Sequence, residues 1–326
     1  MSAQVNLMLT SLAFLGAFLA VGFMGYAIQR GGTCTVAAVD EIVTRHRATR
    51  LAGMVEASLW VAGGIALLHG LGRLPIMPMP YAVTSYTILG GALLGLGAWV
   101  SGACVFGAIA RFGSGEWAYV ATPLGYFAGC TTIGLFAMPA AMRLHTVSPV
   151  LRFPLAVALL FAAFALWRVL PALRRPRTIA ARVWAPHAAT SVIGVTFLVA
   201  LLLAGGTWAY TDVLADLARG MPRGVGTRSL LLLALFGGAL AGGWTAGRLK
   251  PARPRASHVL RCFAGGVLMA WGSLLIPGAN DGLILIGMPM LWPYAWLAFA
   301  SMCVAIAGAM LARRALPQVT LRRSTP

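Results

Sequence analysis

The amino-acid sequence predicts an all-α polytopic membrane protein with about nine transmembrane helices, short re-entrant half-helices and an inverted internal repeat. Of its 326 residues, 60% are hydrophobic and only 10% are charged, whereas an ordinary soluble domain carries roughly 25% charged residues. The apolar runs are continuous and about 20 residues long, as a helix that crosses a hydrocarbon core of about 30 Å requires. A membrane barrel would show alternating segments about half as long. The composition also excludes a disordered chain and a disulfide-stapled secreted module.

Nine apolar stretches qualify, or nearly qualify, as transmembrane helices. They cover residues 5–28, 51–71, 82–100, 117–139, 153–173, 187–204, 228–247, 258–275 and 292–311. No charge precedes Arg30, so the first stretch predicts an uncleaved span with its N-terminus outside. Nineteen of the 25 Lys and Arg residues then lie on one side of the membrane. That side is predicted to be cytoplasmic, in a bacterial inner membrane, with the C-terminus inside.

The net charge of +18 would also suit a nucleic-acid-binding protein. The basic residues, however, sit in short gaps between apolar runs, where topology determinants belong. We therefore predict the lipid bilayer as a partner and no nucleic acid.

The chain matches itself at an offset of 174 to 175 residues. Four elements recur in order: Gly31-Gly32-Thr33-Cys34 as Gly205-Gly206-Thr207-Trp208, Gly72-Arg73-Leu74 as Gly247-Arg248-Leu249, Gly90-Gly91 with Gly97 as Gly265-Gly266 with Gly272, and Gly107 as Gly282. We therefore expect one membrane domain over 1–326, made of four parts. These are a first repeat (1–140, spans 1–4), a linking span 5 with a basic cytoplasmic loop (141–186), a second repeat (187–311, spans 6–9) and a cytoplasmic tail (312–326).

The number of crossings between the two copies is odd, so the second copy starts on the opposite face of the membrane. Inverted repeats of this kind are common in transporters, where the substrate site lies at the repeat interface near the midplane.

Four segments between the spans are too apolar to be ordinary loops and too short to cross. They are residues 33–43, 103–111, 207–218 and 280–288, and we interpret them as re-entrant half-helices. Such backbone is tolerated only where protein buries it or water reaches it. The N-terminus of a half-helix carries unsatisfied N–H groups and favours anions. If these N-termini point inward, Cys34 and Cys104 sit at the two tips of the first half.

These residues resemble the YeeE/YedE family of bacterial membrane proteins. The resemblance lies in Gly90-Gly91…Gly97…Gly102-Ala103-Cys104…Gly107, in the Gly-Gly-Thr-Cys element at 31–34 and in the nine-span inverted repeat, and it covers most of the chain. It implies uptake of a sulfur compound such as thiosulfate. It also implies that Cys34 and Cys104 line the substrate path, and that a small cytoplasmic sulfur carrier of the TusA type is a partner.

The sequence departs from the family pattern at both kinds of tip. Ala103 replaces the second glycine of a Gly-Gly-Cys tip, and Ala279 stands where a further cysteine is expected, so a relay of three thiols is incomplete. Trp208 replaces a cysteine in the repeat and is expected to plug or shape the external entrance. The predicted substrate path is Thr33, Cys34, Gly102, Ala103, Cys104, Trp208, Ala279 and Asn280.

The chemistry of thiosulfate suits thiols on such a path. Its terminal sulfur is soft, and a neutral thiol donates only a weak S–H hydrogen bond to it. Conduction needs binding that is weak enough for release, which a basic residue at the same place would oppose. A covalent relay is the alternative, in which a thiolate takes up the sulfane sulfur as a persulfide.

Two acidic residues and the remaining motifs leave alternatives open. Glu56 is either a functional intramembrane acid or part of a local ion pair with Arg45, Arg47 and Arg50. Asp281 either repels anions from the outer mouth or caps its own half-helix, and we favour the cap. The five histidines are scattered, so we predict no metal and no cofactor.

No Walker, GxSxG or HExxH motif is present, which argues against an enzyme. The rival functions are a transporter of a different small solute and a non-transporting membrane anchor subunit for a sulfur or redox partner.

Overall fold

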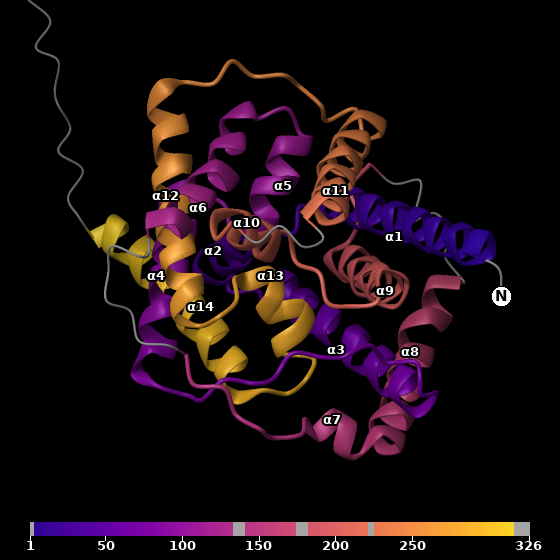
Figure 1. Cartoon of the computed structure of the whole chain (residues 1–326). Coiled ribbons are helices and arrows are strands. Elements are labelled where there is room, and N and C mark those ends of the chain that lie inside the picture. The colour runs from indigo at the N-terminus through magenta and orange to yellow at the C-terminus, as the bar shows by residue number, and fades with distance from the viewer. Residues whose placement is uncertain (1–2, 133–140, 174–181, 221–224, 316–326) are drawn as a thin grey trace, which may run out of the picture.

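The computed structural model describes residues 3–132, 141–173, 182–220 and 225–315, and its regular elements there are all helices. The longer helices are α1 (Ala3–Gly31), α3 (Thr49–Gly70), α4 (Ser85–Ser101), α6 (Ala121–Thr132), α8 (Pro154–Leu173), α9 (Pro186–Ala204), α11 (Val225–Thr245), α12 (Ala256–Leu275) and α14 (Pro293–Ala315). The shorter ones are α2 (Thr35–Arg45), α5 (Val105–Gly113), η1 (Trp117–Val120), α7 (Pro149–Arg152), α10 (Tyr210–Ala218), α13 (Asn280–Gly282) and η4 (Leu283–Gly287). In Figure 1, α2, α10 and α13 lie in the middle of the bundle, with long helices on both sides.

Seven segments of the described chain are long and apolar enough to cross a membrane. They confirm the all-α polytopic class. Two of the segments, Thr10–Arg45 and Ser85–Gly113, run from a long helix into a short one. The predicted spans at 117–139 and 153–173 are not among the seven. Helix α6 is described as far as Thr132, and residues 133–140 lie outside the described residues, while the apolar segment found in the searched part of α8 is Pro154–Leu170. The count of nine stays a prediction, as does the orientation of the termini.

The glycines at the repeat offset form a reciprocal contact between α4 and α12. A Cβ atom on Gly90 would lie 2.7 Å from the carbonyl oxygen of Gly272, and one on Gly272 would lie 2.6 Å from that of Gly90. Gly97 and Gly265 face each other in the same way, at 2.6 and 2.5 Å. Only glycine permits so close an approach of two helix backbones.

The order of these contacts carries information on the symmetry. From the first contact to the second, the residue number rises in α4 from Gly90 to Gly97 and falls in α12 from Gly272 to Gly265, so the two helices are antiparallel. If each residue is replaced by its counterpart at the offset of 175, the Gly90–Gly272 contact becomes the Gly265–Gly97 contact, and the reverse also holds. Two copies related by an axis perpendicular to their helices make this pattern, and from it we infer an inverted repeat.

Other helix contacts come in the same matched pairs. Helix α1 packs against α11 as α9 packs against α3, and α4 packs against α14 as α12 packs against α6. Among the short helices, α2 packs against α14 as α10 packs against α6. Each half therefore holds its own pair of short helices in a similar cradle of long ones.

The linking helix α8 packs against α3 through aromatic rings and an ion pair. The ring of Trp60 lies 5.4 Å from that of Phe161. Glu56 accepts hydrogen bonds at 2.5 Å from Arg168 of α8 and contacts His187 of α9. The expectation of a local ion pair with Arg45, Arg47 and Arg50 is therefore wrong in its partners. Glu56 faces α8 and α9, which follow it by more than 100 residues, and sequence proximity gave no sign of them.

Candidate functional site

The four short central helices begin at Cys34, Cys104, Ala209 and Ala279, which are the N-cap residues of α2, α5, α10 and α13. Each N-cap residue has an extended backbone, and none makes a side-chain capping hydrogen bond. The turn into α5 requires a glycine, because Gly102 ends α4 with a φ of 77°. The first N–H groups of these helices therefore depend on partners from other elements.

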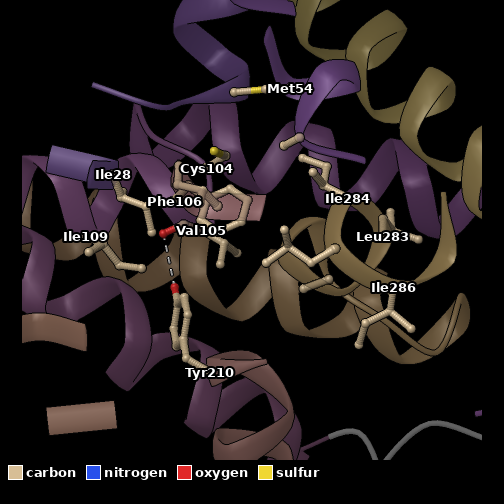
Figure 2. Close-up of a cluster of buried hydrophobic side chains, with 14 of the residues drawn as sticks. Ile28, Met54, Cys104, Val105, Phe106, Ile109, Tyr210, Leu283, Ile284 and Ile286 are labelled. Carbon is tan, nitrogen blue, oxygen red and sulfur yellow. Dashed lines mark hydrogen bonds between the residues drawn. The ribbon is translucent and has the colours of Figure 1, made fainter. Parts of the chain in front are cut away.

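Hydrogen bonds join the beginnings of the short helices to one another. The N–H of Thr35 in α2 donates to Cys104 Sγ at 3.1 Å, and Asn280 Nδ2 in α13 donates to Thr35 Oγ1 at 3.5 Å. The hydroxyl of Tyr210 in α10 donates to the carbonyl oxygen of Val105 at 3.2 Å, as Figure 2 shows. We call these five residues the neck. All five are buried, so the four helices converge on one buried place.

The neck is partly lined with sulfur. Cys34 and Cys104 are both buried, and their thiols lie within hydrogen-bonding reach of each other. The hydroxyl of Thr35 points to Met54 Sδ at 3.7 Å. Gly107 leaves the space for Cys34, because a Cβ atom at that position would lie 2.4 Å from Cys34 Sγ. Such a surface offers weak donors and a polarisable lining rather than fixed charge.

A cavity of about 430 Å³ leads to the neck on the side of α2 and α5. Cys34, Gly102 and Gly107 line its inner part. Its lining also includes three arginines, Arg50, Arg111 and Arg248, and two acids, Asp40 and Glu116.

A second cavity, of about 500 Å³, belongs to α10 and α13. Thr207, Gly278 and Gly282 line it, together with two acids, Asp212 and Asp216. Three arginines, Arg143, Arg219 and Arg228, belong to this lining too. Each pair of short helices thus has one cavity with basic residues in its wall.

The predicted path residues lie around the neck, except that the position predicted for one tip, Trp208, is off by one residue. Ala103, Cys104, Ala279 and Asn280 are buried between the two cavities, and Thr33 is buried beside Cys34. Cys34 and Gly102 line the first cavity. The N-cap of α10 is Ala209, so the prediction that Trp208 takes the place of the tip cysteine is wrong by one residue.

The register error has a plain cause. The repeat offset changes from 174 to 175 inside this turn, and Trp208 is the extra residue. Its side chain is buried and lines neither of these two cavities.

Asp281 caps a second helix besides its own. Its carboxylate accepts hydrogen bonds from the N–H and the hydroxyl of Thr211, at 3.3 and 2.7 Å, near the N-terminus of α10. Backbone N–H groups of its own helix, those of Asp281 and Gly282 in α13, also donate to this carboxylate, so the expected cap of its own half-helix extends to α10. Thr35, Thr211 and Tyr210 are further neck or capping residues that the sequence analysis missed. Their only signal was their place directly after the tips.

Comparisons with known proteins find a family and a relative that match most of the chain. A family model described as sulphur transport matches residues 30–311, a range that includes all four short helices and both tip cysteines. The thiosulfate transporter TsuA of Escherichia coli (strain K12) is 23% identical over 321 residues. The alignment covers 87% of this chain and 90% of that protein.

Proposed function

The chain belongs to the sulphur transport family, the YeeE/YedE proteins, and from this premise we propose that it carries a small sulfur-containing anion of the thiosulfate type through the neck. The observation that supports this proposal most directly is the convergence of four short-helix N-termini on a buried pair of thiols. Helix N-termini favour anions, and thiols suit a soft sulfur atom.

The two cavities collect the anion. Each has three arginines and two acids in its lining, and a wall with an excess of positive charge raises the local concentration of anions. Arg50, Arg111 and Arg248 fall on the side predicted to be cytoplasmic. The arginines of the second cavity fall on the opposite side. Under that topology the cavities approach the neck from the two faces of an inner membrane.

The neck passes the anion without trapping it. Within the described part of the chain, its hydrogen-bonding groups are hydroxyls, amides and thiols, whose hold on an anion is weaker than that of a guanidinium. The terminal sulfur of the anion takes the N–H of Thr35 that Cys104 Sγ now accepts, while the Cys34 and Cys104 thiols donate to it. Because the neck is buried on all sides, passage requires the short helices to move apart.

Two features of the chain favour rival mechanisms, which the experiment must also test. Ala279 replaces a thiol in the second half, which favours a different solute if three thiols are essential. The close approach of Cys34 to Cys104 would also serve a persulfide relay. A cytoplasmic sulfur carrier of the TusA type stays a prediction that the basic inner loops favour.

The test is uptake of ³⁵S-thiosulfate into proteoliposomes by wild type, Cys34→Ala and Cys104→Ala. Cys303→Ala serves as the matched control, because that thiol lies on α14 outside both cavities and the neck. We expect the two tip variants to lose at least about tenfold in uptake, and the control to match wild type. Cys→Ser variants that restore uptake would exclude the persulfide relay.

Normal uptake by both tip variants would refute the thiol-lined path. No uptake by folded wild type would refute thiosulfate as substrate. If a stoichiometric protein then copurifies, the anchor function is favoured instead.

A further inference from the structure

Asp281 is a buried carboxylate without a cationic partner, in the middle of a proposed anion path. Only 2% of its surface is exposed. Within the described residues, its hydrogen-bond donors are the N–H and hydroxyl of Thr211 and the backbone N–H groups of Asp281 and Gly282, and it takes part in no ion pair. An unpaired charge in such a place is costly and repels a passing anion.

Packing does not require a carboxylate at this position. At the offset of 175, the counterpart of Asp281 is Phe106, a buried apolar residue of α5 (Figure 2). The first half achieves the same fold of two short helices with a thiol as the cap, since Cys104 Sγ accepts the N–H of Thr35. The second half alone carries an ionisable acid there.

The second cavity reaches the residues next to Asp281 and Thr211, because Gly282 and Asp212 line it. Asp212, one residue after Thr211, lines that cavity, and its charge interacts with that of Asp281. Asp216, also on α10, is already paired with Arg228 and Arg219. The other titratable groups that face Asp281 are Tyr210 of α10 and Tyr126 of α6, with Cys104 of the α5 N-cap next to Tyr210. Asp212 is also faced by Arg228, Arg219 and Asp216, and by Tyr294 of α14 and Cys130 of α6.

From this arrangement, and resting on the proposed function, we propose that Asp281 and Asp212 bind one proton that is carried together with the anion. The bound proton removes the repulsion between the two carboxylates and neutralises the charge that the anion must pass. Asp281 remains a hydrogen-bond acceptor for Thr211 when it is protonated, because one oxygen keeps its lone pairs.

A proton fits this place better than a sodium or another metal ion. Hard cations require several oxygen ligands, and two of the groups that meet the Asp281 carboxylate are the N–H and O–H donors of Thr211. No group of three metal-ligating acids, histidines or cysteines exists among the described residues.

The experiment measures thiosulfate and protons together in proteoliposomes loaded with pyranine. For wild type we expect thiosulfate to acidify the lumen, and each unit of inward pH gradient to raise its accumulation about tenfold. Asp281→Asn should keep thiosulfate exchange but lose both the acidification and the effect of the gradient. Glu41→Gln is the control, an acid on α2 outside both cavities that accepts the N–H of Arg50. It should behave like wild type.

Each result has one meaning. Thiosulfate uptake by wild type without acidification overturns the proton site and leaves the proposed function standing, and so does accumulation that depends on sodium. Gradient-driven accumulation by Asp281→Asn also overturns it. If wild type shows neither uptake nor exchange of thiosulfate, the proposed function itself is overturned. The wild-type measurement decides the matter even if Asp281→Asn fails to fold.

Discussion

Gly107→Ala should block the path while leaving the fold in place. The added Cβ atom would lie 2.4 Å from Cys34 Sγ, 2.9 Å from Cys34 Cβ and 3.1 Å from the Cβ atom of Ala103. The contact with the sulfur is about 1 Å closer than an unstrained one. Cys34 therefore has to move, and the space it moves into is the inner part of the first cavity.

The cost in stability should be small. Overpacking costs about 1–3 kcal/mol, and alanine regains about 1 kcal/mol of helix propensity over glycine. The net loss is roughly 0–2 kcal/mol, which corresponds to a fall of up to about 8 °C in the unfolding temperature. We expect ³⁵S-thiosulfate uptake to fall by at least about tenfold in the same preparation.

Two further variants test the reasoning. Gly237→Ala on α11 adds the same methyl group where no atom lies within 4 Å, so uptake should equal that of wild type. The double variant Cys34→Ala/Gly107→Ala removes the sulfur atom that the new Cβ atom would contact. It should regain stability but not uptake, because the thiol itself is then missing. Wild-type uptake by Gly107→Ala, at an unchanged unfolding temperature, would refute the close packing of Cys34 against α5.

Three other substitutions test the fold and the neck. Gly97→Ala pushes apart α4 and α12, because its Cβ atom would lie 2.6 Å from the carbonyl oxygen of Gly265; we expect about 1–3 kcal/mol of destabilisation in a thermal-shift assay, and more from Gly97→Leu. Tyr210→Phe removes the hydrogen bond to Val105, which should cost about 1 kcal/mol in urea unfolding and, because the neck loosens, change the thiosulfate KM more than Gly237→Ala does. Glu56→Gln breaks the ion pair with α8 and should lower the free energy of unfolding by about 1–3 kcal/mol. This is less than the loss of a fully buried pair would cost, because the side chains of Arg168 and His187 are 28% and 31% exposed. Unchanged proteolysis of α8 in this variant would argue against a role of the ion pair in holding α8 against α3.

The sequence predicted those parts of the fold that depend on local pattern. Continuous apolar runs identify long helices because the lipid imposes length and internal hydrogen bonding. The spacing of Gly90, Gly97, Gly265 and Gly272 predicted a repeat, and those glycines are where α4 and α12 touch. Four short helices were expected between the spans, and each begins within three residues of its predicted start.

The features that the sequence could not predict depend on tertiary contacts. Asp281 lies in α13, but its partner Thr211 precedes it by 70 residues on α10. The N-terminus of α10 needs an acceptor, and only the packing of the two short helices decides which acid supplies it. The same holds for Glu56, whose partners come from α8 and α9. The single inserted residue Trp208 shifted the register by one position, because Gly31-Gly32 align at an offset of 174 and the later glycines at 175.

The charge that crosses the membrane gives the sharpest test of the asymmetry between the halves. Moving a dianion inward against an inside-negative potential costs about 2.3 kcal/mol per charge for each 100 mV, or about 4.6 kcal/mol for thiosulfate alone. One proton bound at Asp281 and Asp212 halves that cost. At equilibrium, each change of about 59 mV, set with potassium and valinomycin, should therefore shift the thiosulfate gradient about tenfold in wild type and about a hundredfold in Asp281→Asn. A hundredfold shift in wild type would mean that the bare dianion crosses, and that the Asp281 carboxylate serves only to cap α10.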